Sequence, residues 1–358
     1  YENADWGVEL TDTTFESVQK YTDQDGTINT NEFPIHYLDV RYGNFCNLKC
    51  RMCGPTDSHQ WYNDHVKMTG KESYWEITGD VQLKKNNKGR YYTNEYDWFI
   101  DNAQYELNFD KCTQTLKKIY IVGGEPLIIP EHYAALCKLV DKKLANNIQL
   151  EYNTNLTNIT PKILDIWKEF KQVRIGASID GYGDVFEYQR FPGKWNQVYQ
   201  NMLEAEKHTG INLKGWIAFT ITNYNVFHLP EFMKWKLEQS NLTKFNPITG
   251  MRPIITEHLC HNPKYYNIKV LPKYIKKQIT DRNINYIEWV QSTNYSDHVK
   301  IKFAKILQGV NRFMNSEDFD GKILEMFIEE TKKLDKIRSQ NILDIVPQYK
   351  EMFDAYNK

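Results

Sequence analysis

Apolar runs that suit buried strands alternate with segments of helical periodicity between residues 35 and 256. Strands are expected at residues 35–40, 118–122, 148–152, 173–179 and 213–220, with a sixth extended segment within 248–256. Helices are expected at residues 130–143, 162–170, 195–208 and 229–239. Strand–helix units that repeat in this order predict an α/β fold, whose parallel strands are joined by right-handed crossovers.

An insertion and two flanking regions complete the expected organisation of the chain. Residues 57–110 interrupt the first strand–helix unit with an aromatic, polar insertion, in which residues 84–92 predict a hairpin that turns at 87–89. This insertion suits a lid over a substrate, while its basic tip suits either solvent or an RNA contact. We expect an N-terminal extension at 1–33, the α/β unit at 34–260 including the insertion, and a mainly helical region at 261–358.

Composition narrows the class of protein. Forty-five basic residues offset 46 acidic ones, so the net charge of −1 provides no general attraction to nucleic acid or to an anionic membrane. No run approaches the roughly 18 apolar residues of a membrane span, and no signal peptide is visible. The six cysteines do not form the pattern of a disulfide framework. We expect a protein of the reducing cytoplasm, without a membrane or nucleic-acid partner.

Three of the cysteines form the most informative motif of the chain. Cys46, Cys50 and Cys53 follow the first expected strand with the spacing C-x3-C-x2-C, and no fourth cysteine lies nearby. A fully ligated four-iron cluster has four thiolate ligands, so three thiolates suit a cluster with one open iron. Zinc is the alternative, with His59 or His65 as a fourth ligand, although structural zinc sites usually contain paired cysteines.

Other unusual loops also follow expected strands. They are Gly123-Gly124-Glu125-Pro126, Asn153-Thr154-Asn155 and Ser178-Ile179-Asp180-Gly181. In α/β barrels the loops after the strands carry the chemistry, because they meet at one end of the barrel. We therefore expect these three loops to gather with the cysteine loop at a single rim.

The cysteine motif followed by Gly-Gly-Glu-Pro resembles the radical SAM (S-adenosylmethionine) superfamily over about residues 34–256. Ser178-Ile179-Asp180-Gly181 and Arg190 resemble the branch of peptide-modifying and sulfatase-maturing enzymes with SPASM or twitch extensions. This resemblance implies a partial (β/α)6 barrel, one 4Fe–4S cluster and S-adenosylmethionine. It also implies reductive cleavage of the cosubstrate to a 5′-deoxyadenosyl radical, which abstracts a hydrogen atom from a peptide or protein.

The resemblance also assigns residues to the two groups. It implies that Cys46, Cys50 and Cys53 bind the cluster. The implied cosubstrate residues are Met52, Gly123, Gly124, Glu125, Pro126, Asn155, Ser178, Asp180 and Arg190. Ser178 and Arg190 would hold the methionine carboxylate. The glycines would allow close approach of the backbone, and backbone carbonyls there or Glu125 would accept hydrogen bonds from the ammonium.

The chain departs from the family pattern at three places. Met52 replaces an aromatic residue, and Leu156 replaces the glycine of a Thr-Asn-Gly turn. Only Cys260 lies beyond the expected barrel, which predicts a tail without auxiliary clusters. Two roles are open for Cys260. It suits a donor of a hydrogen atom or a proton, or it suits a buried inert thiol.

The sequence leaves several functions open. A flavodoxin- or ferredoxin-type protein is the expected reductant. The substrate is a peptide or protein or, as the alternative, a small metabolite or nucleotide. A non-catalytic metal-binding protein is the third interpretation. The reaction outcome, the fate of the cosubstrate and the oligomeric state are not determined by the sequence.

Overall fold

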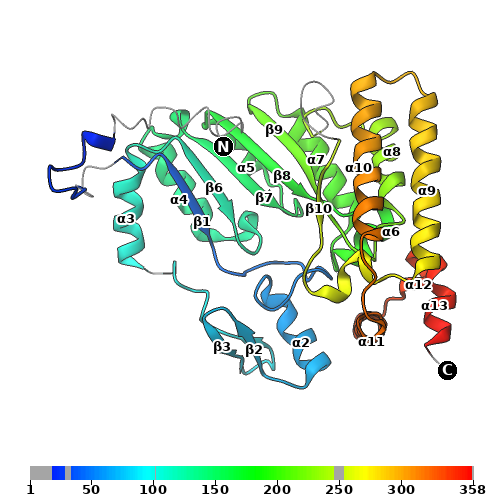
Figure 1. The fold of residues 1–358 in the computed structure, drawn as a ribbon. Helices are drawn as coiled ribbons and strands as arrows, with labels where there is room; N and C mark the ends of the chain where they lie inside the picture. The colour runs from blue at the N-terminus through cyan, green and yellow to red at the C-terminus, as the bar shows by residue number, and fades with distance from the viewer. Residues whose placement is uncertain (1–17, 29–33, 101, 246–253, 357–358) are drawn as a thin grey trace.

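The computed structural model describes residues 18–28, 34–100, 102–245 and 254–356, and its centre is a parallel six-stranded sheet (Figure 1). The strands are β1 (Tyr37–Arg41), β6 (Lys118–Val122), β7 (Gln149–Thr154), β8 (Gln172–Ser178), β9 (Leu213–Ile221) and β10 (Thr256–Leu259). They lie side by side in the order β1-β6-β7-β8-β9-β10. Because every neighbouring pair of strands is parallel, all carboxyl ends meet at one edge, and the predicted α/β class is confirmed.

The first five strands were predicted to within two residues, but the sixth was placed too early. The sixth strand, β10, begins only at Thr256, whereas most of the expected segment at 248–256 falls outside the described residues. The sequence Thr-Glu-His-Leu contains one apolar residue, so no apolar run marks it as a strand. The segment is a strand because it pairs in parallel with β9, from Thr256 opposite Ala218 to Leu259 opposite Ile221.

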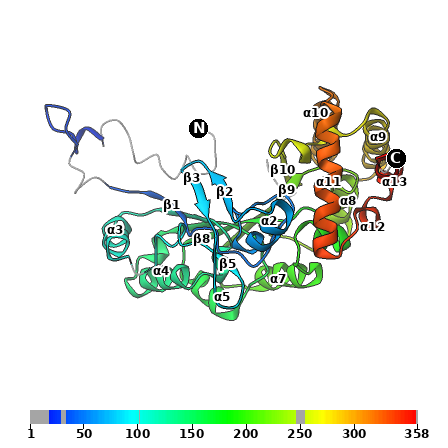
Figure 2. The same ribbon diagram turned by 90° about the horizontal axis from the view of Figure 1, so that it is seen from below.

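Helices cover one face of the sheet, and Figure 2 shows α4, α5 and α7 lying together on that side. The helices between the strands are α4 (Pro130–Asp141), α5 (Pro161–Lys168), α6 (Gly183–Gln189), α7 (Trp195–Lys207) and α8 (Leu229–Glu238). Helix α5 starts where expected because the side chain of Thr160 caps the amide of Ile163 and proline occupies the first helical position. Between sheet and helices lies the main core, in which Tyr152 and Trp167 are fully buried.

The insertion forms a small unit beneath the carboxyl ends of the strands (Figure 1). It contains η2 (His59–Trp61), α2 (Tyr62–Thr69), β2 (Ser73–Glu76), β3 (Gly79–Gln82), β4 (Lys84–Lys85) and β5 (Tyr91–Tyr92). The chain then returns to the side of the sheet, where α3 (Ala103–Thr113) lies next to α4 (Figure 1). The hairpin expected at 84–92 is present as β4 and β5. The helices α2 and α3 and the hairpin of β2 and β3 were not predicted. The small apolar core of Tyr62, Tyr74, Val81 and Leu83 is separate from the main core, to which Phe109 of α3 belongs.

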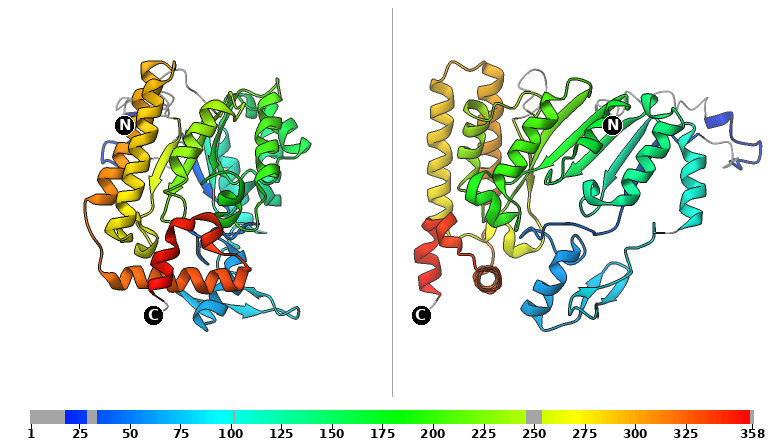
Figure 3. Two further views of the ribbon diagram at one scale, coloured as in Figure 1. Left: turned by 90° about the vertical axis from the view of Figure 1, so that its right-hand side faces the viewer. Right: turned by 180° about the vertical axis from the view of Figure 1, so that it is seen from behind.

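The chain after the sheet is mainly helical, as predicted. Its principal helices are α9 (Lys273–Ser292), α10 (Asp297–Asn315), α11 (Gly321–Arg338), α12 (Ile342–Ile345) and α13 (Lys350–Ala355). Helices α9 and α10 stand side by side next to β10, and α11 crosses beneath them towards α2 (Figures 2 and 3). Among the described residues, no helix is both long enough and apolar enough to cross a membrane.

Candidate functional site

The cysteine loop follows β1 and is held by contacts within the loop and with the insertion. Cys46 and Cys50 are buried, and Cys53 is half-buried. The amide of Leu48 donates to Cys46 Sγ at 3.4 Å, and the hydroxyl of Ser58 donates to the carbonyl of Leu48. The loop therefore places the three thiols in an ordered backbone frame.

The two histidines of the zinc alternative are engaged elsewhere. His59 Nδ1 accepts the amide of Cys46 at 3.1 Å, and its Nε2 lies 3.0 Å from Nε2 of Gln60. His65 Nε2 lies 2.9 Å from the carbonyl oxygen of Ser73. Among the described residues, no three His, Cys, Asp or Glu side chains converge on a point that could hold a single metal ion. The arrangement does not support a zinc site with either histidine as the fourth ligand.

Gly123 and Gly124 bring the loop after β6 against the cysteine loop. Both have positive φ angles, 88° and 52°, and a Cβ atom on Gly124 would lie 2.1 Å from the carbonyl oxygen of Phe45. The amide of Glu125 donates to the same carbonyl at 2.8 Å. Glycine is therefore required here by backbone packing within the protein, in addition to any close approach of a cosubstrate.

Glu125, one of the expected acceptors for the ammonium group, already accepts hydrogen bonds from within the protein. It is almost fully buried, and it accepts the hydroxyl of Thr154 and the amide of Asn155, each at 2.6 Å, and the amide of Leu127 at 3.1 Å. Burial raises the pKa of Glu125, whereas these donors act in the opposite direction. Glu125 thus joins the loops after β6 and β7, while Pro126 begins the short helix η3 (Pro126–Ile128).

Asn155 reaches from the end of β7 to the cysteine loop. Its Nδ2 atom lies 3.0 Å from Oδ1 of Asn47 and 3.9 Å from Cys46 Sγ. The next residue, Leu156, is fully buried and has a φ angle of 56°. This left-handed conformation explains why a glycine is the usual residue at the position, and the buried side chain offsets the strain in this chain.

Asp180 and Arg190 form a buried pair beside Cys50. Arg190 Nη2 lies 2.7 Å from Asp180 Oδ2, and its Nη1 lies 3.8 Å from Cys50 Sγ. Asp180 Oδ1 accepts the amide of Thr220 at 2.7 Å, which ties the pair to the end of β9. Burial raises the pKa of Asp180, and the Arg190 cation opposes this shift.

These loops surround a cavity of about 650 Å³ at the carboxyl ends of the strands. Its walls include all three cysteines and most of the residues that the resemblance implies. The implied residues in its lining are Met52, Gly123, Gly124, Glu125, Asn155, Ser178 and Arg190. Pro126 and Asp180 do not line it, so any role that they have in binding acts through the loop turn and through Arg190.

The insertion supplies one wall of the cavity, which the sequence did not predict in residue detail. Glu76, Tyr96 and Trp98 line it, and the hydroxyl of Tyr96 donates to Glu76 Oε2 at 2.6 Å. No motif marks these residues, and the aromatic richness of the segment was the only available signal. Their position depends on the packing of the two small hairpins.

Cys260 does not line this cavity. It follows β10 and belongs to the main core. Its Sγ donates to the carbonyl of Asn262 at 3.3 Å, and burial raises the pKa of the thiol to about 11. The placement favours the buried inert thiol over a hydrogen donor.

The chemistry of the cavity fits an iron–sulfur cluster and a ligand with an anionic group. Burial raises the pKa of Cys46 to about 12, whereas a hydrogen bond from Cys53, followed by the Arg190 charge, lowers that of Cys50. Thiol ligands must lose their protons on metal binding, so these pKa values make assembly dependent on pH. The buried Nε of Arg190 has no hydrogen-bond partner among the described residues and is available to an anion.

Comparison with known proteins identifies the family of the chain. The chain matches the radical SAM superfamily over residues 40–228, more than half of its length. An uncharacterized protein from Methanothermobacter thermautotrophicus is 29% identical over 127 residues, which cover 35% of this chain and 47% of the relative. The chain therefore spans about half the length of this curated relative.

Solved structures that match part of the chain include anSMEcpe with bound AdoMet, at 16% identity and a TM-score of 0.41, covering 72% of this chain and 61% of the other. SuiB of Streptococcus suis bound to S-adenosylmethionine is 14% identical, with a TM-score of 0.38 and coverage of 73% and 46%. By its match over more than half of its length, the chain belongs to the radical SAM superfamily of enzymes, whose cofactors are a 4Fe–4S cluster and S-adenosylmethionine.

Proposed function

We propose that Cys46, Cys50 and Cys53 bind one 4Fe–4S cluster and that S-adenosylmethionine occupies the adjacent cavity. The single observation that carries this proposal is the convergence of the three thiols with Arg190 and the Gly123–Gly124 turn around one cavity. A site with three thiols leaves one iron without a protein ligand. The cavity provides space for the cosubstrate at that position.

The residues around the cavity have distinct proposed roles. Arg190, held by Asp180, orients the methionine carboxylate through the planar donors of its guanidinium. Ser178 lines the same wall at the end of β8, and Met52 packs against the adenine. Glu125 keeps the loop after β6 in place through its three buried hydrogen bonds.

When bound, the cluster and S-adenosylmethionine would supply the difficult chemistry. One electron from the reduced cluster would cleave the sulfonium into methionine and a 5′-deoxyadenosyl radical, which would abstract a hydrogen atom from the substrate. A flavodoxin- or ferredoxin-type protein is the proposed source of the electron. The protein provides orientation and shields the reacting groups. The burial of Cys46 and Cys50 is consistent with this shielding role.

A peptide or protein is the proposed substrate. The Ser178, Asp180 and Arg190 pattern supports this choice through its resemblance to the peptide-modifying branch. The insertion also exposes aromatic side chains: Trp98, which lines the cavity, is 45% exposed, and Trp75 on β2 is 72% exposed. Exposed aromatic side chains suit contact with a polypeptide, whereas a small metabolite or nucleotide, the alternative, would be covered by the insertion as a lid.

Anaerobic reconstitution tests the cofactors first. The protein should take up about four iron and about four sulfide per chain, and reductant with S-adenosylmethionine should then release 5′-deoxyadenosine. The Cys46→Ala/Cys50→Ala/Cys53→Ala variant is the control and should do neither. A reconstituted and reduced protein that cleaves no S-adenosylmethionine, while an active radical SAM enzyme does so in parallel, would contradict the proposal.

A second experiment tests the substrate class. Peptides encoded beside the gene and small metabolites of the same operon are offered to the active enzyme with deuterium at candidate positions. Transfer of deuterium into 5′-deoxyadenosine from a peptide supports the proposed substrate. Transfer only from a metabolite or nucleotide replaces it with the alternative.

A further inference from the structure

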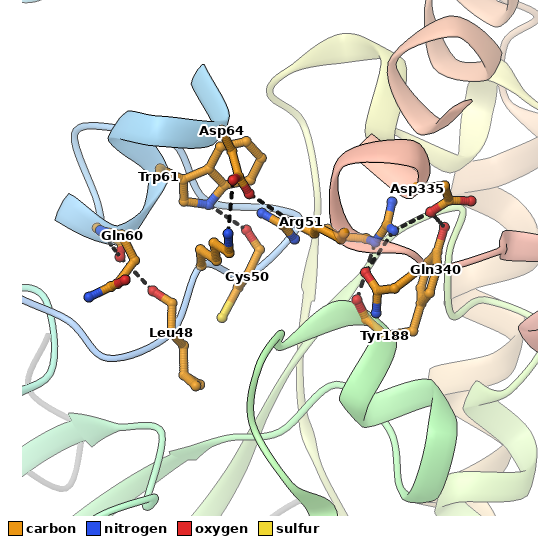
Figure 4. Close-up of polar contacts among 12 residues, drawn as sticks. Leu48, Cys50, Arg51, Gln60, Trp61, Asp64, Tyr188, Asp335 and Gln340 are labelled. Atoms are coloured by element: carbon orange, nitrogen blue, oxygen red, sulfur yellow. Dashed lines mark hydrogen bonds and ion pairs between the residues drawn. The ribbon is translucent and has the colours of Figure 1, made fainter. Parts of the chain in front are cut away.

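The C-terminal helix α11 reaches the cysteine loop through two sets of buried charges. One set joins Arg51, between Cys50 and Met52, to Asp335 on α11, and the other joins Arg338 on α11 to Asp64 on α2. The partners lie 284 and 274 positions apart in the sequence. Figure 4 shows Arg51 extending from the loop towards Asp335 and Gln340, with Asp64 on the other side of the loop.

Arg51 is fully buried, and its Nε and Nη2 atoms donate hydrogen bonds, whereas its Nη1 has no hydrogen-bond partner among the described residues. Its Nη2 donates to Asp335 and, at 3.0 Å, to Gln340, and its Nε donates to the carbonyl of Tyr188 at 3.2 Å. Its guanidinium carbon lies 3.6 Å from the centre of the Tyr188 ring. The hydroxyl of Tyr188 also donates to Asp335 at 2.9 Å, so the contact includes the helix α6 that precedes Arg190.

Arg338 forms the second contact. Its Nε donates to Asp64 Oδ2 at 2.9 Å, and Lys49 from the cysteine loop donates to Oδ1 of the same carboxylate at 2.8 Å. Its guanidinium carbon lies 4.6 Å from the ring of Trp61. The indole of Trp61 donates to the carbonyl of Cys50 at 2.9 Å, so Arg338 is one side chain away from a cluster ligand.

Charges of both signs surround the loop. Four cations, Lys49, Arg51, Arg190 and Arg338, pair with three carboxylates, Asp64, Asp180 and Asp335. Three more acidic residues, Asp57, Glu76 and Glu125, line the adjacent cavity. Neither Nη atom of Arg338 has a hydrogen-bond partner among the described residues, and its side chain is fully buried. A buried charge is poorly screened, so the cation acts on its surroundings more strongly than a surface arginine.

We propose that α11 is part of the cluster site: Asp335 and Arg338 hold the cysteine loop through Arg51 and Asp64, and the Arg338 cation raises the reduction potential of the cluster bound there. This inference rests on the proposed function, because it concerns the cluster that the cysteines bind. Reduction adds a negative charge to the cluster, and a nearby buried cation favours the reduced form. Arg338 and Asp64 are positioning residues that act through the loop.

Redox titration monitored by electron paramagnetic resonance tests the electrostatic part. Arg338→Met should shift the midpoint potential of the cluster to a more negative value because it removes a cation. Arg338→Lys keeps the cation, so its midpoint potential should lie closer to that of the protein without substitutions. Asp64→Asn should shift the potential in the opposite direction because it leaves Arg338 and Lys49 without their carboxylate. A loss of structure alone would move the two variants in the same direction.

The matched control is Arg282→Gln. Arg282 pairs with Glu231 and donates to the carbonyl of Phe227 at 3.0 Å, a similar contact between the C-terminal helices and the α/β unit but without the cysteine loop. This variant should keep the potential of the unchanged protein. It should also keep its rate of iron loss to a chelator, whereas Asp335→Asn should lose iron several-fold faster.

The possible outcomes separate the two proposals. If the protein without substitutions takes up no cluster, the proposed function is wrong. If that protein takes up a cluster and cleaves S-adenosylmethionine, while Arg338→Met and Asp64→Asn have the same midpoint potential as it does, the inference about α11 is wrong and the proposed function stands. The inference is also wrong if both variants shift the potential in one direction.

Discussion

Arg190 and Asp180 form a buried ion pair, in which Nη2 lies 2.7 Å from Oδ2, at the edge of the cavity that holds the three cysteines. Asp180 does not line the cavity, but it directs Arg190 so that Nη1 lies 3.8 Å from Cys50 Sγ. Asp180, which lies outside the cavity lining, therefore sets the position of the Arg190 guanidinium, which is part of the lining.

Asp180→Asn should weaken the binding of S-adenosylmethionine about tenfold, which corresponds to about 1.4 kcal/mol. Asparagine can still accept the amide of Thr220, but it does not hold the Arg190 cation as strongly. Equilibrium binding to the reconstituted protein measures the effect, with iron content expected to be unchanged. Asp165→Asn, in the exposed pair with Lys168, should bind as the unchanged protein does, and equal affinity in both variants would contradict this role of Asp180.

Gly124→Ala should destabilise the protein by about 2–5 kcal/mol and reduce cluster assembly. The added Cβ would meet the carbonyl of Phe45 at 2.1 Å, and a left-handed conformation is unfavourable for alanine. Thermal and denaturant unfolding measure the loss. In contrast, Gly309→Ala, in helix α10 with open space around the position, should stabilise the protein by up to about 1 kcal/mol.

Cys260→Ala should leave iron content and cleavage of S-adenosylmethionine unchanged, because its thiol lies in the core and outside the cavity lining. Cys50→Ala should lose the cluster and all cleavage. Iron and sulfide analysis and the yield of 5′-deoxyadenosine distinguish the two variants. A Cys260→Ala protein that assembles its cluster but releases no 5′-deoxyadenosine would contradict this prediction.

Lys236 should make the protein more stable as the pH rises above neutrality. Burial lowers the pKa of this lysine to about 7 from its ordinary value of 10.5. Between these values the unfolded chain binds more protons than the folded one, so the free energy of unfolding rises with pH, by at most about 1.4 kcal/mol per pH unit. This contribution is complete above pH 10.5 and is lost as the pH falls through 7.

Denaturant unfolding between pH 7 and 8.5 measures this dependence, in a range below the ordinary titration of most thiols. The variant Lys236→Met should remove the rise in stability. The exposed Lys277, in an i,i+4 pair with Asp281, provides the control, and Lys277→Met should keep the rise. If Lys236→Met shows the same slope as the unchanged protein, the lysine is not the titrating group.

The order and boundaries of five strands were predictable because apolar runs such as 118–122 mark buried strands directly in the sequence. The polar strand β10 was misplaced because it becomes a strand only by pairing with β9. The carboxylate of Glu125 illustrates the same limit at the site. Its motif was visible, but its three internal hydrogen bonds depend on where β7 lies.

The sequence by itself determined the α/β class, the three cysteines and the family, because spacing within a loop and apolar periodicity are local properties of the chain. Only the tertiary structure brought Glu76 and Tyr96 to the cavity and Arg338 to the cysteine loop. Arg338 and Asp64 are 274 positions apart, and no local pattern marks two such residues as partners. Their contact arises from the packing of α11 against α2, which depends on the whole fold.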